Sequence, residues 1–285
     1  MPKSKTQAQA QAADRPLKKT ASSSNKNPTA PNWPPLRPLL PAADLHLTSL
    51  VQDQIYLIRN FLPATLCKTY TAFLSSLPLT TTPGRPKKDE AVRVNDRFQI
   101  EDARFAESLW SGTALRELVT ERFREDDDLE DTDTHGEDSI SDQDHNAIGQ
   151  ASESQSQQLR HTWGGTPLGL NPNIRIYRYS KGQFFAQHYD ESNALTFLPP
   201  STTKPLPVRT TWTLLIYLTK CEGGETVFYP DPTRATPHPP PITVAPEVGM
   251  ALLHRHGDRC MLHEGKEVLG GEKWVIRSDL VVSKP

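Results

Sequence analysis

The chain has 285 residues, of which 35% are hydrophobic and 23% are charged, and its formal net charge is -2. This near-neutral balance excludes a strong overall attraction to nucleic acid or to an acidic membrane surface, so we expect neither as a partner. The length allows one or two domains, and the low hydrophobic content indicates that part of the chain lies outside a packed core.

The three cysteines, Cys67, Cys221 and Cys260, are far apart in the sequence and form no CxxC pair. Their number and spacing fit neither a disulfide framework nor a zinc ribbon, and favour reduced thiols. No apolar run is long enough for a transmembrane helix, and the first residues lack the apolar stretch of a secretory signal. We therefore expect a cytoplasmic or nuclear protein.

Residues 1–45 are rich in Lys, Gln, Ala, Ser and Pro, which predicts a disordered tail. Basic residues between Arg15 and Lys19 fit either a nuclear-import signal or incidental charge. We expect a folded domain over 46–285 that begins with a strand at 54–58 and a helix at 63–77, and a second helix is predicted over 103–123.

An acidic stretch begins at Glu125 and contains no Lys or Arg as far as Asp144, and polar residues follow it. This composition predicts a disordered insertion at about 125–160. The alternative is an acidic loop that attracts a metal or binds a partner.

From Gly169 onward the sequence is typical of β-structure. Short runs of β-branched and apolar residues are separated by turn residues, and they predict strands near 173–179, 210–218, 226–229, 249–254 and 273–282. Several short strands of this kind indicate a sandwich or a barrel.

His188 and Asp190 lie two residues apart in a segment expected to be extended, where positions i and i+2 face the same side. One more imidazole, for which His263 is the candidate, would complete a two-histidine, one-carboxylate set that suits iron(II) and leaves coordination positions open. An H-x-D pattern alone occurs often by chance, so the order of the surrounding motifs carries more weight.

That order resembles the prolyl-4-hydroxylase-like branch of the iron(II)/2-oxoglutarate oxygenases. The matching parts run through residues 171–285 in the family's order: Arg178-Tyr179, Gly182-Gln183-Phe184, His188 and Asp190, the strand Thr213 to Leu218, Gly223-Gly224-Glu225-Thr226-Val227-Phe228, His263 and Lys273. Residues 50–123 resemble the supporting helices of such folds only loosely.

The resemblance implies a mainly β fold with supporting α-helices, a double-stranded β-helix or jelly-roll, and makes 46–285 an oxygenase domain. It implies that His188, Asp190 and His263 bind Fe(II). It also implies that Lys273 pairs with the far carboxylate of 2-oxoglutarate, with Tyr179 and Thr213 as further hydrogen-bond partners.

The implied activity is hydroxylation of a C–H bond with O2, which releases succinate and carbon dioxide, on a protein or peptide side chain. Ascorbate is a further candidate cofactor. Three alternatives remain open: the same chemistry on a small molecule such as a free amino acid, a cupin-like dioxygenase that needs no 2-oxoglutarate, and a non-catalytic interaction protein on a degenerate jelly-roll.

Three features depart from the family pattern or lie outside it. Asp279 stands six residues after Lys273, where collagen-type relatives usually have Trp, which weakens the inference that the substrate is proline. Arg277 shares a strand face with Lys273 and Asp279, so it could reach a carboxylate of the cosubstrate or substrate, or form a structural ion pair with Asp279. His254 and His256 could form another metal pair, although a structural role for both is favoured because no third ligand accompanies them.

Overall fold

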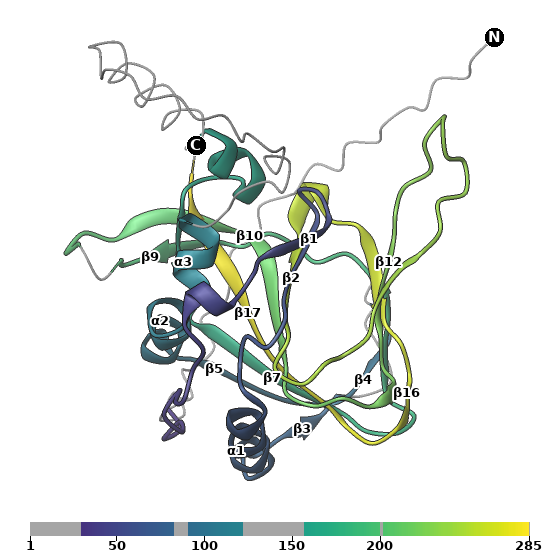
Figure 1. Cartoon of the computed structure of the whole chain (residues 1–285), viewed down its shortest axis with the longest axis horizontal. Helices are drawn as coiled ribbons and strands as arrows, with labels where there is room; N and C mark the ends of the chain where they lie inside the picture. Colours follow the sequence, from purple (N-terminus) through teal and green to yellow (C-terminus); the bar gives the residue numbers. More distant parts are fainter. Residues whose placement is uncertain (1–29, 83–90, 122–156, 200–201, 285) are drawn as a thin grey trace, which may run out of the picture.

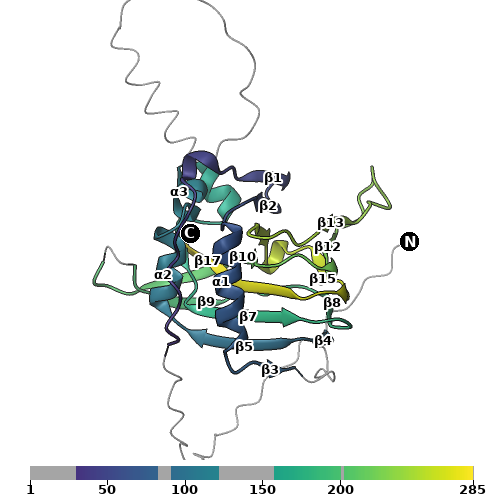
Figure 2. The same ribbon diagram turned by 60° about the horizontal axis from the view of Figure 1, so that its bottom comes forward.

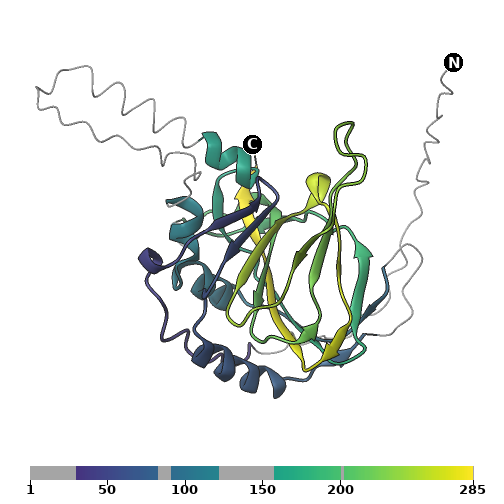
Figure 3. The same ribbon diagram turned by 45° about the vertical axis from the view of Figure 1, so that its right-hand side comes forward.

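The computed structural model describes residues 30–82, 91–121, 157–199 and 202–284. Two antiparallel sheets face each other and enclose a barrel-like interior, while helices lie outside the larger sheet (Figures 1 and 3). This is a jelly-roll, as the motif order predicted. None of the helices in these ranges is long and apolar enough to cross a membrane.

The larger sheet has ten strands. In spatial order these are β1 (Thr48–Val51), β2 (Ile55–Ile58), β14 (Ala251–Arg255), β10 (Leu206–Tyr217), β17 (Lys273–Ser283), β7 (Asn173–Tyr179), β5 (Asp96–Glu101) and β3 (Thr80–Thr81), with β6 (Pro167–Leu170) paired to β17 and β9 (Ala194–Phe197) paired to β10.

The smaller sheet has five strands, in the order β13 (Ile242–Val244), β12 (Thr226–Tyr229), β15 (Leu262–Gly265), β8 (Phe184–His188) and β4 (Arg93–Val94). A separate short pair joins β11 (Glu222–Gly223) to β16 (Val268–Gly270).

The helices α1 (Ala64–Ser75), α2 (Ala103–Ser111) and α3 (Leu115–Thr120) cover the outer face of the larger sheet, and α1 crosses its strands in Figure 2. Short 3-10 helices occupy Ala42–Asp44 (η1) and Gly257–Arg259 (η3). The helix expected over 103–123 is thus two helices, because the chain turns between Ser111 and Leu115, where the Thr113 hydroxyl donates to the Leu109 carbonyl.

The strand β17 shows how the two faces of the larger sheet differ. Trp274, Ile276 and Leu280 pack into the apolar core beneath the helices. Lys273 and Arg277, which alternate with them, line a cavity on the opposite face, between the sheets. Successive side chains of a strand point to opposite faces, so one strand builds both the core and the site.

The expectation of a disordered tail over 1–45 is wrong for residues 30–45. Trp33 stacks on Phe105 with ring centroids 4.0 Å apart, and its indole nitrogen donates to the Asp102 carboxylate at 2.8 Å. Asp102 also caps α2, since its side chain accepts from the Phe105 amide. The few apolar residues among the prolines therefore suffice to hold this segment on the core.

Residues 1–29 lie outside the described residues, so the prediction of a tail is untested there. Most of the insertion predicted at about 125–160 also lies outside them, in 122–156, and its state stays a prediction. Residues 157–163 are helical, so the last part of that prediction is wrong. Trp163, at the end of this helix, is fully buried and donates its indole hydrogen to the Val119 carbonyl, which explains why the segment is ordered.

Candidate metal centre

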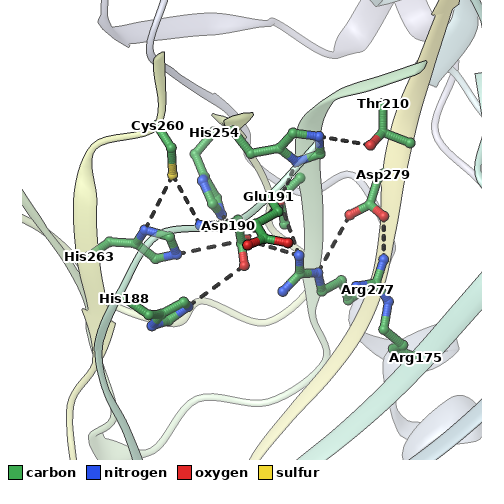
Figure 4. A network of polar contacts seen from close by, with 12 residues as sticks. Arg175, His188, Asp190, Glu191, Thr210, His254, Cys260, His263, Arg277 and Asp279 are labelled. Atoms are coloured by element: carbon green, nitrogen blue, oxygen red, sulfur yellow. Dashed lines mark hydrogen bonds and ion pairs between the residues drawn. The ribbon is translucent and has the colours of Figure 1, made fainter. Parts of the chain in front are cut away.

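The smaller sheet brings the three predicted metal ligands together. His188 ends β8 and lies directly opposite His263 of β15 in the antiparallel register, and Asp190 follows β8 by two residues. The Nε2 atom of His188 lies 3.7 Å from Asp190 Oδ1, and that of His263 lies 3.8 Å from Asp190 Oδ2 (Figure 4). One ligand atom from each side chain lies within 4.8 Å of the other two.

Backbone carbonyls orient both imidazoles. His188 donates from Nδ1 to the Ala186 carbonyl at 2.8 Å, and His263 donates from Nδ1 to the Met261 carbonyl at 2.9 Å. A carbonyl only accepts, so the proton must sit on Nδ1, which leaves the Nε2 lone pair free. This is the usual arrangement of histidines that bind metals in proteins.

Burial keeps these imidazoles neutral. It lowers the pKa of His188 to about 3, with a smaller contribution from His263, and it also lowers the pKa of His263. Burial alone would raise the pKa of Asp190, but Arg277 and the neighbouring imidazoles outweigh it and hold that pKa well below its usual value. Neutral imidazoles beside a carboxylate are the protonation states that a divalent metal requires.

Lys273 opens β17 and is buried on the wall of the same cavity as His188, Asp190 and His263. Its Nζ donates to the Gly224 carbonyl at 2.7 Å and lies over the rings of Tyr179 and Tyr217 at 5.6 and 5.3 Å from their centroids. Burial lowers the pKa of Lys273 to about 8. No salt bridge pairs Lys273 with a carboxylate among the described residues.

Thr213, expected to hydrogen-bond the same carboxylate of 2-oxoglutarate as Lys273, lies beside Asp190 rather than beside Lys273. Its hydroxyl donates to Asp190 Oδ2 at 2.9 Å and lies 3.4 Å from Arg277. The hydroxyl near Lys273 is that of Thr226, which lies 3.5 Å from Nζ and lines the cavity. Thr213 lies within β10 and Thr226 opens β12, and the sequence does not show which of the two faces Lys273.

Arg277 contacts two carboxylates of the protein, Asp190 and Asp279. Its guanidinium lies 2.9 Å from Asp190 Oδ2 and 3.5 Å from Asp279 Oδ1. Asp279 is fully buried and also pairs with Arg175. The ion pair with Asp279 therefore exists, and the contact with Asp190, which the sequence did not suggest, links that pair to the candidate metal centre.

The two histidines of β14 and its end have different surroundings. His256 is hydrogen-bonded to Thr213 at Nδ1 and to Thr210 at Nε2, both at 3.0 Å, which supports a structural role. His254 instead lines the cavity, with Nε2 3.7 Å from Asp190 Oδ2. His254 lies on the same face of β14 as Leu252, two residues earlier, and Leu252 packs in the apolar cluster between the sheets. The sequence alone does not show which face of β14 points inward.

A family model described as "2OG-Fe(II) oxygenase superfamily" matches residues 174–278, from β7 to β17. This segment contains all three candidate metal ligands and Lys273. No curated protein matches the chain.

Solved structures with similar folds include a viral collagen prolyl hydroxylase from Paramecium bursaria Chlorella virus-1, with 15% identity and a TM-score of 0.41 over 80% of this chain and 96% of that one. A prolyl hydroxylase from Trichoplax adhaerens, in complex with a hypoxia inducible factor peptide, has 14% identity and a TM-score of 0.43 over 80% and 83%. The carbocyclase SnoK of nogalamycin biosynthesis has 15% identity and a TM-score of 0.43 over 81% and 80%.

Proposed function

We propose that this protein is a 2-oxoglutarate-dependent dioxygenase that binds Fe(II) through His188, Asp190 and His263 and hydroxylates a C–H bond of a protein or peptide side chain. The match of residues 174–278 to the family model described as "2OG-Fe(II) oxygenase superfamily" supports the proposal. One observation carries the proposal. The two imidazoles and the carboxylate meet on the wall of the cavity that also contains the buried Lys273.

The donor set fits the metal. Two neutral imidazoles with free Nε2 atoms and one carboxylate form the set that non-haem iron(II) oxygenases use, with positions left open for cosubstrate and oxygen. When bound, Fe(II) and 2-oxoglutarate supply the oxygen activation that places one oxygen atom on the substrate and the other in succinate. Ascorbate, as a reductant that maintains Fe(II), stays a prediction.

Lys273 binds the far carboxylate of 2-oxoglutarate. A buried ammonium group is costly without a counter-ion, and its contacts within the described residues are to a neutral carbonyl and a hydroxyl. A dicarboxylate in the cavity supplies the missing partner through a charge-assisted hydrogen bond. Tyr179 and Tyr217 shield this pair from water, because both rings lie over the ammonium group.

The preference for a large substrate is supported by Tyr189. It stands between the two ligands of the H-x-D motif, and 59% of its surface is exposed. Exposed aromatic side chains beside a site offer a contact area for a protein or peptide, since one end is apolar and the other can hydrogen-bond. We expect Tyr189→Ala to raise KM for a peptide substrate and to leave the affinity for 2-oxoglutarate unchanged.

The test is succinate formation by the purified full chain with Fe(II), 2-oxoglutarate and O2, in the presence of peptide pools and of free amino acids and other small molecules. We expect succinate in amounts that rise with a peptide pool and disappear in His263→Ala. A rise in succinate only with small molecules would show that the substrate is a small molecule and not a peptide. No succinate, combined with no binding of metal or 2-oxoglutarate, would favour the interaction protein. Product formation without 2-oxoglutarate would favour the cupin-like dioxygenase.

A further inference from the structure

The two oxygens of the Asp190 carboxylate have different surroundings. Oδ2 forms an ion pair with the Arg277 guanidinium at 2.9 Å and accepts a hydrogen bond from the Thr213 hydroxyl, also at 2.9 Å. Within the described residues, no side chain or amide donates such a hydrogen bond to Oδ1, which lies 3.7 Å from His188 Nε2. The protein therefore occupies one oxygen of this carboxylate and leaves the other available.

The guanidinium charge determines which oxygen suits a metal. The distances to the ligand histidines do not, because His188 Nε2 lies 3.7 Å from Oδ1 and His263 Nε2 lies 3.8 Å from Oδ2. A divalent ion on Oδ2 would share that oxygen with Arg277, and two positive charges so close together inside a protein repel strongly. An ion on Oδ1 keeps the attraction of the carboxylate and avoids this neighbour. Oδ1 is therefore the metal-binding oxygen that the arrangement favours.

Arg277 is held in its direction from the other side. Its Nε lies 3.5 Å from Asp279 Oδ1, and Figure 4 shows the guanidinium between the carboxylates of Asp190 and Asp279. Asp279 is itself fully buried and fixed, since it pairs with Arg175 and accepts from the Asn171 amide at 3.2 Å. A guanidinium between two fixed carboxylates has little freedom to turn away from either.

A purely structural ion pair accounts for only half of this arrangement. Asp279 already has a cation in Arg175, so its burial does not depend on Arg277 alone. Buried ion pairs are also weak evidence for stability, because the loss of hydration offsets their attraction. The contact of Arg277 with Asp190, on the wall of the cavity, is the part that a structural role leaves unexplained.

We propose that Arg277, together with Thr213, is a positioning residue that keeps Asp190 bound to the metal through Oδ1 alone. This inference rests on the proposed iron site. Two imidazoles and one oxygen leave three positions of an octahedral ion open, two for 2-oxoglutarate and one for O2. If Oδ2 bound as well, the cosubstrate would fill the last two positions. Arg277 thus preserves the position that O2 needs.

The two cations of the cavity then have separate roles. Arg277 is committed to Asp190 and Asp279, whereas Lys273 contacts only a carbonyl and a hydroxyl within the described residues. A dicarboxylate that enters the cavity therefore finds its free cation at Lys273. It follows that loss of the Arg277 charge should affect the open metal position and leave 2-oxoglutarate bound.

The test is binding of nitric oxide, which occupies the position of O2, to the full chain loaded anaerobically with Fe(II) and 2-oxoglutarate. Nitric oxide on iron gives a characteristic electron paramagnetic resonance signal, and an absorption band of the chelated keto acid reports bound 2-oxoglutarate. We expect both in the wild type. In Arg277→Met/Thr213→Val, where Oδ2 is released toward the metal, the band should persist and the nitric oxide signal should fall about tenfold or more.

Two further variants separate positioning from a structural role. Arg277→Lys in place of Arg277→Met keeps a positive charge on a chain of similar length and should recover most of the signal. Arg175→Met is the matched control, because it removes the other guanidinium from Asp279 without a contact to Asp190, and it should behave as the wild type. Thr213→Val alone, with a smaller loss of signal, replaces the double variant should that variant fold poorly.

An unchanged nitric oxide signal in the double variant would overturn the inference and leave the proposed function intact. An equal loss of signal in Arg175→Met, or a wild type that binds 2-oxoglutarate but no nitric oxide, would overturn it as well. Loss of the keto-acid band together with the nitric oxide signal in the double variant would show that Arg277 binds the cosubstrate instead. The absence of both signals in the wild type would overturn the proposed iron site, and the inference with it.

Discussion

The two faces of the larger sheet are both buried, yet they differ in chemistry. On the outer face, Trp274 and Ile276 of β17 pack with α1 and the other helices into an apolar core. On the inner face, Lys273, Arg277 and Asp279 of the same strand are buried too, and all three are charged. Two residues that are adjacent in sequence, Lys273 and Trp274, thus belong to different parts of the molecule.

The comparison teaches that burial alone does not identify a core. An apolar face stabilises the fold in proportion to the area it removes from water, whereas a buried charge costs free energy unless it is paired. The inner face offsets this cost with a chain of alternating charges, in which Arg277 lies between Asp190 and Asp279. Lys273 has no such partner within the described residues, and for that reason it is the best candidate for binding an anion.

The largest effect on stability is expected on the outer face. Trp274→Ala should lower the free energy of unfolding by about 3–5 kcal/mol, because it leaves a large cavity beneath α1. The affinity of the folded protein for 2-oxoglutarate should stay unchanged. Urea denaturation and isothermal titration of 2-oxoglutarate measure the two quantities. A loss of affinity for 2-oxoglutarate in Trp274→Ala without a loss of unfolding free energy would show that the outer face also contributes to binding, against the distinction drawn between the two faces.

A substitution of the neighbouring residue Lys273, on the inner face, should instead weaken 2-oxoglutarate binding and leave stability intact. Lys273→Met should weaken 2-oxoglutarate binding by about 2–5 kcal/mol, or roughly 30- to 5,000-fold, because the far carboxylate loses its cation. The free energy of unfolding should be unchanged or higher, since methionine is buried at no electrostatic cost. Equal 2-oxoglutarate affinity in the variant and the wild type would show that another group binds the carboxylate.

A smaller effect follows from the pKa of Lys273, which burial lowers from its usual 10.5 to about 8. Only the charged lysine pairs with the carboxylate, so affinity for 2-oxoglutarate should be constant below about pH 7.5. Above pH 8 it should fall by about tenfold per pH unit. Titrations between pH 6.5 and 9.5 measure this slope, and Lys273→Arg, whose guanidinium stays charged, should show no slope in the same range.

The stability of the ligand-free protein should change in the opposite direction over the upper part of this range. The lysine binds fewer protons in the folded than in the unfolded chain between about pH 8 and its usual pKa of 10.5. Its contribution to the free energy of unfolding therefore rises with pH in that window, and below it the cost of burying the charge is fully present. Lys273→Met, compared with the wild type by urea denaturation at several pH values, isolates this contribution.

The jelly-roll and the meeting of His188, Asp190 and His263 could be predicted because ordered motifs on strands fix both register and face. Other features could not be. Trp33 lies among prolines, and its stacking on Phe105 depends on a long-range contact that local composition does not encode. The contact of Arg277 with Asp190 and the direction of His254 depend on which face of each strand turns inward. The alternation of residue types along a strand shows which residues share a face, but not which of the two faces lies inside. Cytoplasmic or nuclear location stays a prediction.

The central claim is that one cavity binds iron through His188, Asp190 and His263 and a dicarboxylate through Lys273. The most direct measurement is anaerobic titration of the Fe(II)-loaded wild type with 2-oxoglutarate, followed by visible absorption. We predict that a charge-transfer band of the chelated keto acid develops with one equivalent of 2-oxoglutarate. The band should require much more 2-oxoglutarate in Lys273→Met and should be absent in His263→Ala. A wild type that binds Fe(II) without developing any band, or a band of full strength in His263→Ala, would contradict the account.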